Sequence, residues 1–474
     1  YQAQKWGRVA KMKIENQGKE DGVVTVRVRL LDKNNVPCLD ATDWVSFGLT
    51  GDGRLIDNMG TSTGSRYVQA YNGQAMIRLH TNNGRSVVSV RSGALLTAFL
   101  DVDGHGDSVL AVAEKTLREG ALKEAAWALQ QSPITVTSYR CPRSAGGPHD
   151  FYSEGDYWWP DPKHPDSPYI QRDGITNPDN FTAHRLAMIR LSRIVGALAT
   201  AYRLTGDAKY IQPALRHCRA WFVDSATRMN ANLLYAQAIK GRATGRGIGI
   251  IDTIQLMEVV MGLEAIENSP AMDQELLEEI RAWFSKYLLW LTTHAYGKAE
   301  MNAANNHGTC WVMQVAAFAH FTRNREMMDY CRRRYKDVLL PGQMASDGSF
   351  PLELKRTKPY GYSLFNLDAM ATICQILSSP EDDLWHYQTA DGRGIEKGIS
   401  YMAPYMADKG KWPFAHDVMY WNEWPVAQPS LVFGASALGR EDWLPIWKKL
   451  EHAPVNEEVI RNLPVRHPII WLNK

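Results

Sequence analysis

The sequence predicts a mainly α-helical protein, an α/α toroid of helical hairpins preceded by a small antiparallel β-sandwich. The first supporting observation is composition, because 474 residues that are 45% hydrophobic and 22% charged can bury a large core. The second is a change in hydrophobic period near residue 110, from two residues to a helical spacing. We therefore predict two domains, residues 1–108 and 109–474.

The first domain reads as a series of short alternating strands. Gly, Asn and Asp clusters separate these strands, as turns require. The expected strands cover residues 23–30, 43–48, 75–80 and 85–91. Period-two runs at this spacing are typical of a β-sandwich.

The second domain reads as a succession of long helices. An amphipathic segment at 110–129 begins it. Further helices are expected at 183–203, 208–222, 250–266, 273–292, 305–321, 324–338, 363–378 and 392–407, with no clear strand among them. Many helices of this length without a strict repeat fit a toroid of helical hairpins.

Charge, cysteine content and hydrophobic runs exclude several classes of function. The 53 basic and 51 acidic residues give a net charge of +2, which offers no reason to expect nucleic acid as a partner. No apolar run reaches the length of a membrane span. The six cysteines contain no CxxC pair, so we expect buried free thiols and no metal site. Because the chain starts at Tyr1, we expect a processed piece of a longer precursor that carries further domains.

An aromatic segment at 150–162, DFYSEGDYWWPDP, is predicted to be a loop. Tyr157, Trp158 and Trp159 lie between a glycine-rich approach and a proline-bounded exit. Tandem aromatic rings with polar neighbours offer flat faces for sugar rings. The alternative is a packed anchor that holds the loop on the barrel, and composition alone favours neither interpretation.

Two further segments combine polar groups that can handle charge. In NAANNHGTCW, Asn305, Asn306 and His307 precede an apolar helix, where one Asn is expected as a cap and His307 is a candidate for anion or proton handling. In PLELKRTKPYGYSLFNL, the cations around Arg356 precede two tyrosines. Such cations are usually a solvated face, but near a tyrosine they lower its pKa from about 10.

A glycine-rich segment, LYAQAIKGRATGRGIGIID, does not have the spacing of a phosphate-binding loop and follows no strand. Its Arg242 and Arg246 are therefore expected to meet a carboxylate.

Five motifs in order resemble the alginate lyase superfamily of α/α-toroid polysaccharide lyases, which includes family 5. They are HDFYSEGDYWWPDP, RDGITNPDN, LLYAQAIKGRATGRGIGIID, NNHGTCW and RTKPYGYSLFNLDAM. In the first domain, LLDKNNVPCLDATDWVSFGLTGDGRLI and NNGRSVVSVRSG resemble the immunoglobulin-like C-terminal domain of family 2 β-galactosidases. The resemblance implies an immunoglobulin-like accessory domain followed by an incomplete α/α barrel with a long cleft.

The resemblance also implies an activity, β-elimination in a uronic acid polymer without a required metal or cofactor. Asn306, His307 and Arg356 would neutralise the uronate carboxylate, and Tyr362 or Tyr360 would transfer the proton. We favour Tyr362 because the residues after it keep the family's helix pattern. Either His307 or Tyr362 could be the base, depending on the uronic acid epimer. The residues expected to bind substrate are Tyr157, Trp158, Trp159, Tyr235, Gln237, Arg242, Arg246 and Asn305.

Two other functions are compatible with parts of the sequence. A glycoside hydrolase needs two opposed carboxylates, for which the candidates are Asp156, Glu353, Asp417 and Glu423. A non-catalytic carbohydrate-binding protein would explain the aromatic residues but not the Asn, His and Arg set. The expected partner is an anionic polysaccharide, such as alginate, glucuronan or a glucuronate-bearing plant glycan. The expected location is the bacterial periplasm or the outside of the cell.

Overall fold

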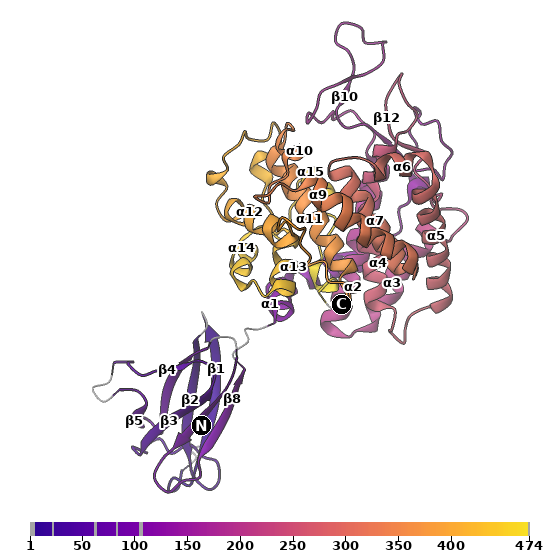
Figure 1. Ribbon diagram of the computed structural model, residues 1–474. Coiled ribbons are helices and arrows are strands. Elements are labelled where there is room, and N and C mark those ends of the chain that lie inside the picture. Colours follow the sequence, from indigo (N-terminus) through magenta and orange to yellow (C-terminus); the bar gives the residue numbers. More distant parts are fainter. Residues whose placement is uncertain (1–4, 21–22, 61–63, 82–83, 104–107, 473–474) are drawn as a thin grey trace. The chain divides into compact units, whose positions relative to one another are not determined.

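The computed structural model describes residues 5–20, 23–60, 64–81, 84–103 and 108–472. Contacts divide the chain into two compact units, Tyr1–Ser108 and Val109–Lys474. The first unit contains strands and the second is dominated by helices (Figure 1). The predicted fold class, a β-sandwich followed by an α/α toroid, is confirmed.

The N-terminal unit is a sandwich of two four-stranded antiparallel sheets. One sheet has the order β1-β2-β6-β4 and the other β5-β3-β7-β8. The strands are β1 (Lys11–Glu20), β2 (Val23–Leu31), β3 (Trp44–Gly51), β4 (Arg54–Ile56), β5 (Tyr67–Gln69), β6 (Gln74–His80), β7 (Arg85–Arg91) and β8 (Ala98–Asp103). Alternate residues of β2, Val24, Val26 and Val28, are buried between the sheets, as the period of two requires.

The second unit is built from fifteen α-helices within its described residues. They are α1 (Val109–Leu129), α2 (Ala183–Thr205), α3 (Ile211–Phe222), α4 (Leu256–Ile266), α5 (Gln274–Thr293), α6 (Ala295–Met301), α7 (Asn306–Phe321), α8 (Arg325–Arg334), α9 (Leu340–Gln343), α10 (Pro351–Leu354), α11 (Pro359–Leu377), α12 (Ile395–Ala407), α13 (Pro429–Leu438), α14 (Leu444–Lys449) and α15 (Glu457–Arg461). Helices α7 and α11 are buried along almost their whole length. A helix that is apolar all round belongs in a core, so these two form the centre of the unit.

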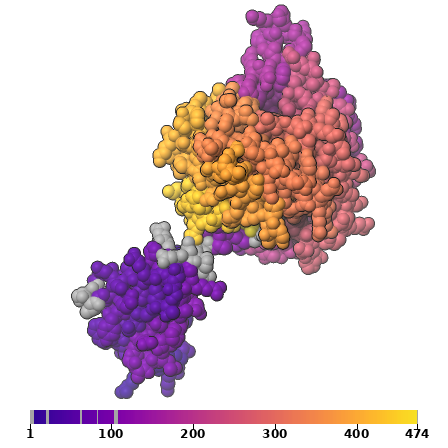
Figure 2. Space-filling model, in the orientation of Figure 1, coloured from indigo at the N-terminus to yellow at the C-terminus, as the bar shows by residue number. Residues whose placement is uncertain are grey.

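Short strands project from the helical body, contrary to the expectation of no strand in this domain. Strand β9 (Tyr152–Glu154) pairs in parallel with β12 (Tyr235–Ala238), and β10 (Trp158–Trp159) pairs with β11 (Ile170–Gln171). The tandem tryptophans therefore lie in a strand and not in a loop. Segments of two to four residues are too short to show a period. Figures 1 and 2 show this part standing out from the helices.

Several predicted helix boundaries were wrong. The helix predicted from residue 363 begins at Pro359, because proline suits the first turn of a helix. The helix predicted at 324–338 is α8 followed by a π-turn at Tyr335–Leu339.

All six cysteines are free and buried. Among the described residues, no helix is both long and apolar enough to cross a bilayer.

Candidate active site

A cleft in the helical unit collects residues from strands β10 to β12 and from the N-terminal ends of α7 and α11. It encloses about 620 Å³, including the solvent at its mouth. The side chains around it are Asp156, Tyr157, Trp158, Gln171, Asp173, Gln237, Arg246, Ile248, Ile251, Asn306, His307, Arg356, Tyr362, Phe365, Arg461 and Asn462. The structure thus brings together most of the residues that the motifs singled out.

Asn306 is held rigidly at the start of α7. Its backbone N–H and its side-chain Nδ2 both donate to Glu353, each over 2.8 Å. The Asn305 side chain caps the helix by accepting from the backbone N–H of His307. Asn305 therefore has the structural role that was the simpler interpretation, and it does not line the cleft.

His307 forms a close pair with a buried carboxylate that the sequence analysis did not identify. Its Nδ1 lies 2.7 Å from Oε1 of Glu300. Burial alone would lower the pKa of His307, but the charge and hydrogen bond of Glu300 outweigh burial and raise it. The Glu353 carboxylate adds to the rise, whereas the Arg356 charge opposes it. An imidazolium that donates from Nδ1 to Glu300 keeps Nε2–H as its second donor.

Tyr362 meets the hydroxyl of Tyr157 inside the cleft. The two hydroxyl oxygens are 2.7 Å apart, and Nη2 of Arg356 lies 3.5 Å from the Tyr362 oxygen. The charged groups of Arg356 and Lys358 lie 4.5 and 5.2 Å from the centre of its ring. Burial nevertheless raises the pKa of Tyr362 well above 10, although both cations act to lower it. The expectation of a lowered tyrosine pKa was wrong because desolvation of the phenolate is the larger effect.

The structure distinguishes the two candidate tyrosines. Tyr360 is fully buried, donates its hydroxyl to the carbonyl of Tyr405 and packs against Trp412 and Trp421. Residues two apart on a helix point in nearly opposite directions, so only one of the pair can face the cleft. That residue is Tyr362.

Arg356 is already paired with a carboxylate. Its guanidinium donates to both oxygens of Asp173, over 2.9 and 3.3 Å, and Thr357 donates to the same side chain. Burial acts to raise the pKa of Asp173, but the hydrogen bond and charge of Arg356, the hydrogen bond from Thr357 and the charge of Lys358 together outweigh burial and lower it. A substrate carboxylate at Arg356 would therefore share or replace the contact with Asp173.

Arg246 is a second guanidinium in the cleft, and it has no carboxylate partner among the residues that the structure describes. It donates to the backbone and side-chain oxygens of Gln237, over 2.8 and 3.1 Å. Its charged group lies 5.7 Å from the ring of Trp158. Gln237 has a left-handed backbone, with φ of 49°, which turns its side chain towards this arginine. Arg246 is therefore available to an anionic ligand.

Four other expected binding residues do not line the cleft. Trp159 donates to the carbonyl of Ile175 beneath the guanidinium of Arg172. Arg242 donates to a backbone carbonyl and lies over Trp158. Tyr235 packs against a small cluster that contains Tyr152 and Ala238, and Asn305 caps helix α7. The packed-anchor interpretation of the aromatic segment fits Trp159, whereas Trp158 and Tyr157 face the cleft.

Three of the four carboxylates that a hydrolase would use already have hydrogen-bond or ion-pair partners. Asp156 is bound by Arg185 and Arg461. Glu353 accepts two hydrogen bonds from Asn306, and Asp417 accepts the backbone N–H groups of Tyr360 and Gly361. Glu423 lies in a separate surface pocket. None of these four presents a free carboxylate opposite another in the cleft.

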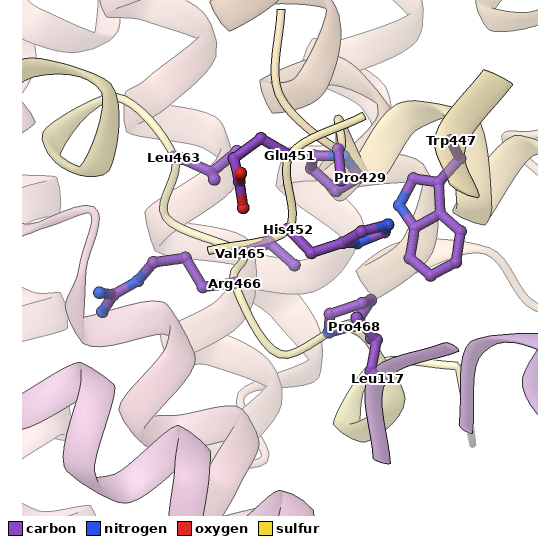
Figure 3. A pocket seen from close by; sticks show the side chains of 10 residues that line it. Leu117, Pro429, Trp447, Glu451, His452, Leu463, Val465, Arg466 and Pro468 are labelled. Atoms are coloured by element: carbon purple, nitrogen blue, oxygen red, sulfur yellow. The ribbon is translucent and has the colours of Figure 1, made fainter. Parts of the chain in front are cut away.

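A second pocket, near the C-terminal segment, is too small for a sugar (Figure 3). Its free space of about 20 Å³ holds roughly one water molecule. Trp447 Nε1 and His452 Nε2 have no hydrogen-bond partner within the described part of the chain. Apolar side chains such as Leu117 and Val465 form much of its wall.

Comparison with known proteins finds similarity to alginate lyases. A structure described as an alginate lyase from Bacteroides ovatus is 29% identical to this chain and superposes with a TM-score of 0.65. The match spans 77% of this chain and 97% of that one. An alginate lyase of Pseudomonas fluorescens is 30% identical over 110 residues, which is 22% of this chain and 29% of that protein. A structure described as a β-glucuronidase from Parabacteroides merdae is 48% identical over a match that spans 22% of this chain and 13% of that chain, with a TM-score of 0.21.

A Formosa agariphila protein described as a putative β-glucuronidase is 34% identical over 79 residues, 17% of this chain and 10% of that protein. The chain thus spans less than a third of either curated relative. The sequence model described as alginate lyase matches residues 135–412. Since this match covers more than half of the sequence, the chain belongs to the alginate lyase family.

Proposed function

We propose that the protein is a polysaccharide lyase that cleaves a uronic acid polymer by β-elimination. The observation that carries the proposal is the convergence of Asn306, His307, Arg356 and Tyr362 on one cleft. The first three are hydrogen-bond donors for a carboxylate, and the fourth is a proton-transfer group. Preorganised donors of this kind stabilise the enolate that forms when a uronate loses its C5 proton.

Tyr362 serves as both base and acid in this proposal. The Tyr362 phenol first loses its proton to solvent water, which the charges of Arg356 and Lys358 favour and burial opposes. The phenolate then takes the C5 proton and passes that same proton to the departing glycosidic oxygen, so it is a phenolate again after the step. The C5–H and C4–O bonds break, a C4–C5 double bond forms, and the tyrosine ends as it began. His307 is the alternative base. We assign it instead as a donor to the substrate carboxylate, because Glu300 at Nδ1 raises its pKa and so favours the protonated ring.

The assay that tests the proposal follows the new double bond. Conjugation with the carboxylate makes the product absorb in the ultraviolet. A hydrolase would release reducing ends without that absorbance, and a binding protein would give neither. Absence of the absorbance with alginate, glucuronan and glucuronate-bearing plant glycans would reject the proposal. The periplasm or the cell exterior is where we propose that such polymers are met.

The single proton-transfer group also predicts a substrate preference. One tyrosine can move a proton from C5 to the C4 oxygen only if both lie on the same ring face. They do so in D-mannuronate and D-glucuronate, but not in L-guluronate. We expect mannuronate-rich alginate or glucuronan to be cleaved at least tenfold faster than guluronate-rich alginate, as measured by initial rates of ultraviolet absorbance. Faster cleavage of the guluronate polymer would assign the base to a group on the other face.

Trp158 is proposed to stack on a sugar ring. We expect Trp158→Ala to raise KM about tenfold, the size of one ring contact of roughly 1.4 kcal/mol, with a smaller change in kcat. Trp159→Ala is the matched control, since Trp159 lies outside the cleft lining. Steady-state kinetics on the polymer measure both. A KM effect in the control alone would exchange the two roles.

No metal or cofactor is needed in this proposal because Asn306, His307 and Arg356 neutralise the carboxylate. We expect kcat and KM to be unchanged after dialysis against EDTA. Loss of activity that calcium restores would contradict the assignment of these three side chains.

A further inference from the structure

The N-terminal unit exposes three aromatic side chains on one face of the sheet β5-β3-β7-β8, of which β3, β5 and β8 are labelled in Figure 1. Trp44 is 44% exposed, Tyr67 is 52% exposed and Phe99 is 66% exposed. In β3, Trp44 alternates with the buried Val45 and so points outward. Tyr67 is opposite Ser46, which places it diagonally beside Trp44, and the two rings stack with centroids 4.9 Å apart.

Small side chains separate this aromatic pair from Phe99. Ser46 and Gly48 of β3 face the same side as Trp44, and Ser89 of β7 is opposite Gly48. Phe99 of β8 is opposite Ser89. A Cβ at Gly48 would lie 2.6 Å from the Ser89 hydroxyl oxygen, so glycine leaves this strip flat. Tyr67 on β5 and Phe99 on β8 lie on the two edge strands of the sheet, three strand spacings or roughly 14 Å apart.

A cation lies on the same strip. Arg91 of β7 is opposite Ser46, is exposed, and has no ion-pair partner among the residues described. The face therefore combines aromatic rings, hydroxyl groups and the guanidinium of Arg91, which is free to meet an anion, with the exposed carboxylate of Asp101 beyond Phe99 on β8.

We propose that this face binds an acidic polysaccharide outside the catalytic cleft. Pyranose rings would stack on Trp44, Tyr67 and Phe99, and Arg91 would bind a carboxylate of the chain. The choice of a uronic polymer as ligand rests on the proposed function. A polyanion suits this face better than a protein partner, because Arg91 and the serine hydroxyls interrupt the apolar area that the core of a protein interface would need.

Such a face would act by keeping the polymer near the enzyme. A second binding module raises the local concentration of a long ligand but not of one too short to reach both sites. Variants of this face should therefore slow the cleavage of polymer and leave the cleavage of short oligosaccharides unchanged.

The test compares variants that keep both units of the chain by affinity electrophoresis in gels that contain alginate, glucuronan or neutral dextran. We expect Trp44→Ala/Tyr67→Ala to weaken binding to the acidic polymers about tenfold, relative to the wild type. Arg91→Ala should weaken the same binding and reduce its dependence on salt, with no effect in dextran. Tyr71→Ala is the matched control, because Tyr71 is 78% exposed but lies outside the strands of this sheet.

The Trp44→Tyr variant keeps an aromatic ring and should therefore keep most of the binding. It thus distinguishes loss of the ring's contact with the sugar from unfolding of the unit. Wild-type affinity in the double variant would overturn the proposal. So would a dimer, seen by light scattering, that the double variant converts to a monomer, since the face would then join two copies. Failure of the proposed function would show differently, as a lack of ultraviolet-absorbing product from the wild type itself.

Discussion

Replacement of Tyr362 by Phe should lower kcat by at least about 10³-fold while leaving substrate affinity within a few-fold of the wild type. The change removes one oxygen, which in our proposal carries the proton from C5 to the leaving group. The ring that packs beneath Arg356 and Lys358 remains in place. The measurements are the initial rate of ultraviolet absorbance and the affinity for oligosaccharide by calorimetry.

Tyr360→Phe is the matched control, two residues away on the same helix. It deletes a hydroxyl that donates to the carbonyl of Tyr405 inside the core. We expect a loss of about 1 kcal/mol in the free energy of unfolding and little change in kcat. Full activity in Tyr362→Phe with inactivity in Tyr360→Phe would reverse the assignment of the two tyrosines.

The fold class was predictable because the hydrophobic period and the turn residues are local signals. Helix α2 and strand β7 were predicted within two residues of their observed bounds. The pairs β9–β12 and β10–β11 were missed because each gains its hydrogen bonds from a distant segment. Pairing of this kind leaves no period in a strand of two residues.

The candidate site was predictable at the level of motifs, but not of side-chain directions. Trp158 and Trp159 are adjacent residues of the same type, so the sequence alone does not distinguish them, yet only Trp158 lines the cleft. The partners that orient the site were missed for a related reason. Asp173 is 183 residues from its partner Arg356, and Glu353 is 47 residues from its partner Asn306. No local sequence pattern links residues so far apart, so only the folded structure brings each pair together.

Glu300 is the missed residue with the largest expected effect on chemistry. Its side chain is buried, and it contacts Nδ1 of His307 from the preceding helix, α6. A protonated His307 turns an Nε2–H donor towards the cleft. A neutral His307 that still donates from Nδ1 to Glu300 would turn a lone pair towards the substrate carboxylate instead. Activity in the proposed mechanism therefore requires the raised pKa of His307 that the Glu300 carboxylate provides.

Glu300→Gln should move the alkaline loss of kcat/KM to lower pH. The amide still accepts from Nδ1, but without the negative charge the pKa of His307 falls, because burial and Arg356 both lower it and only Glu353 remains to raise it. We expect a loss of up to about 10²-fold on the alkaline side of the profile, the scale of one preorganised donor, and a smaller loss at acid pH, where the imidazole is protonated again. The pH profile of kcat/KM measures this shift.

Glu264→Gln is the control, because Glu264 pairs with His320 at the same 2.7 Å but outside the cleft lining. An equal loss at every pH would assign Glu300 a structural role and leave the charge of His307 without a part in the reaction.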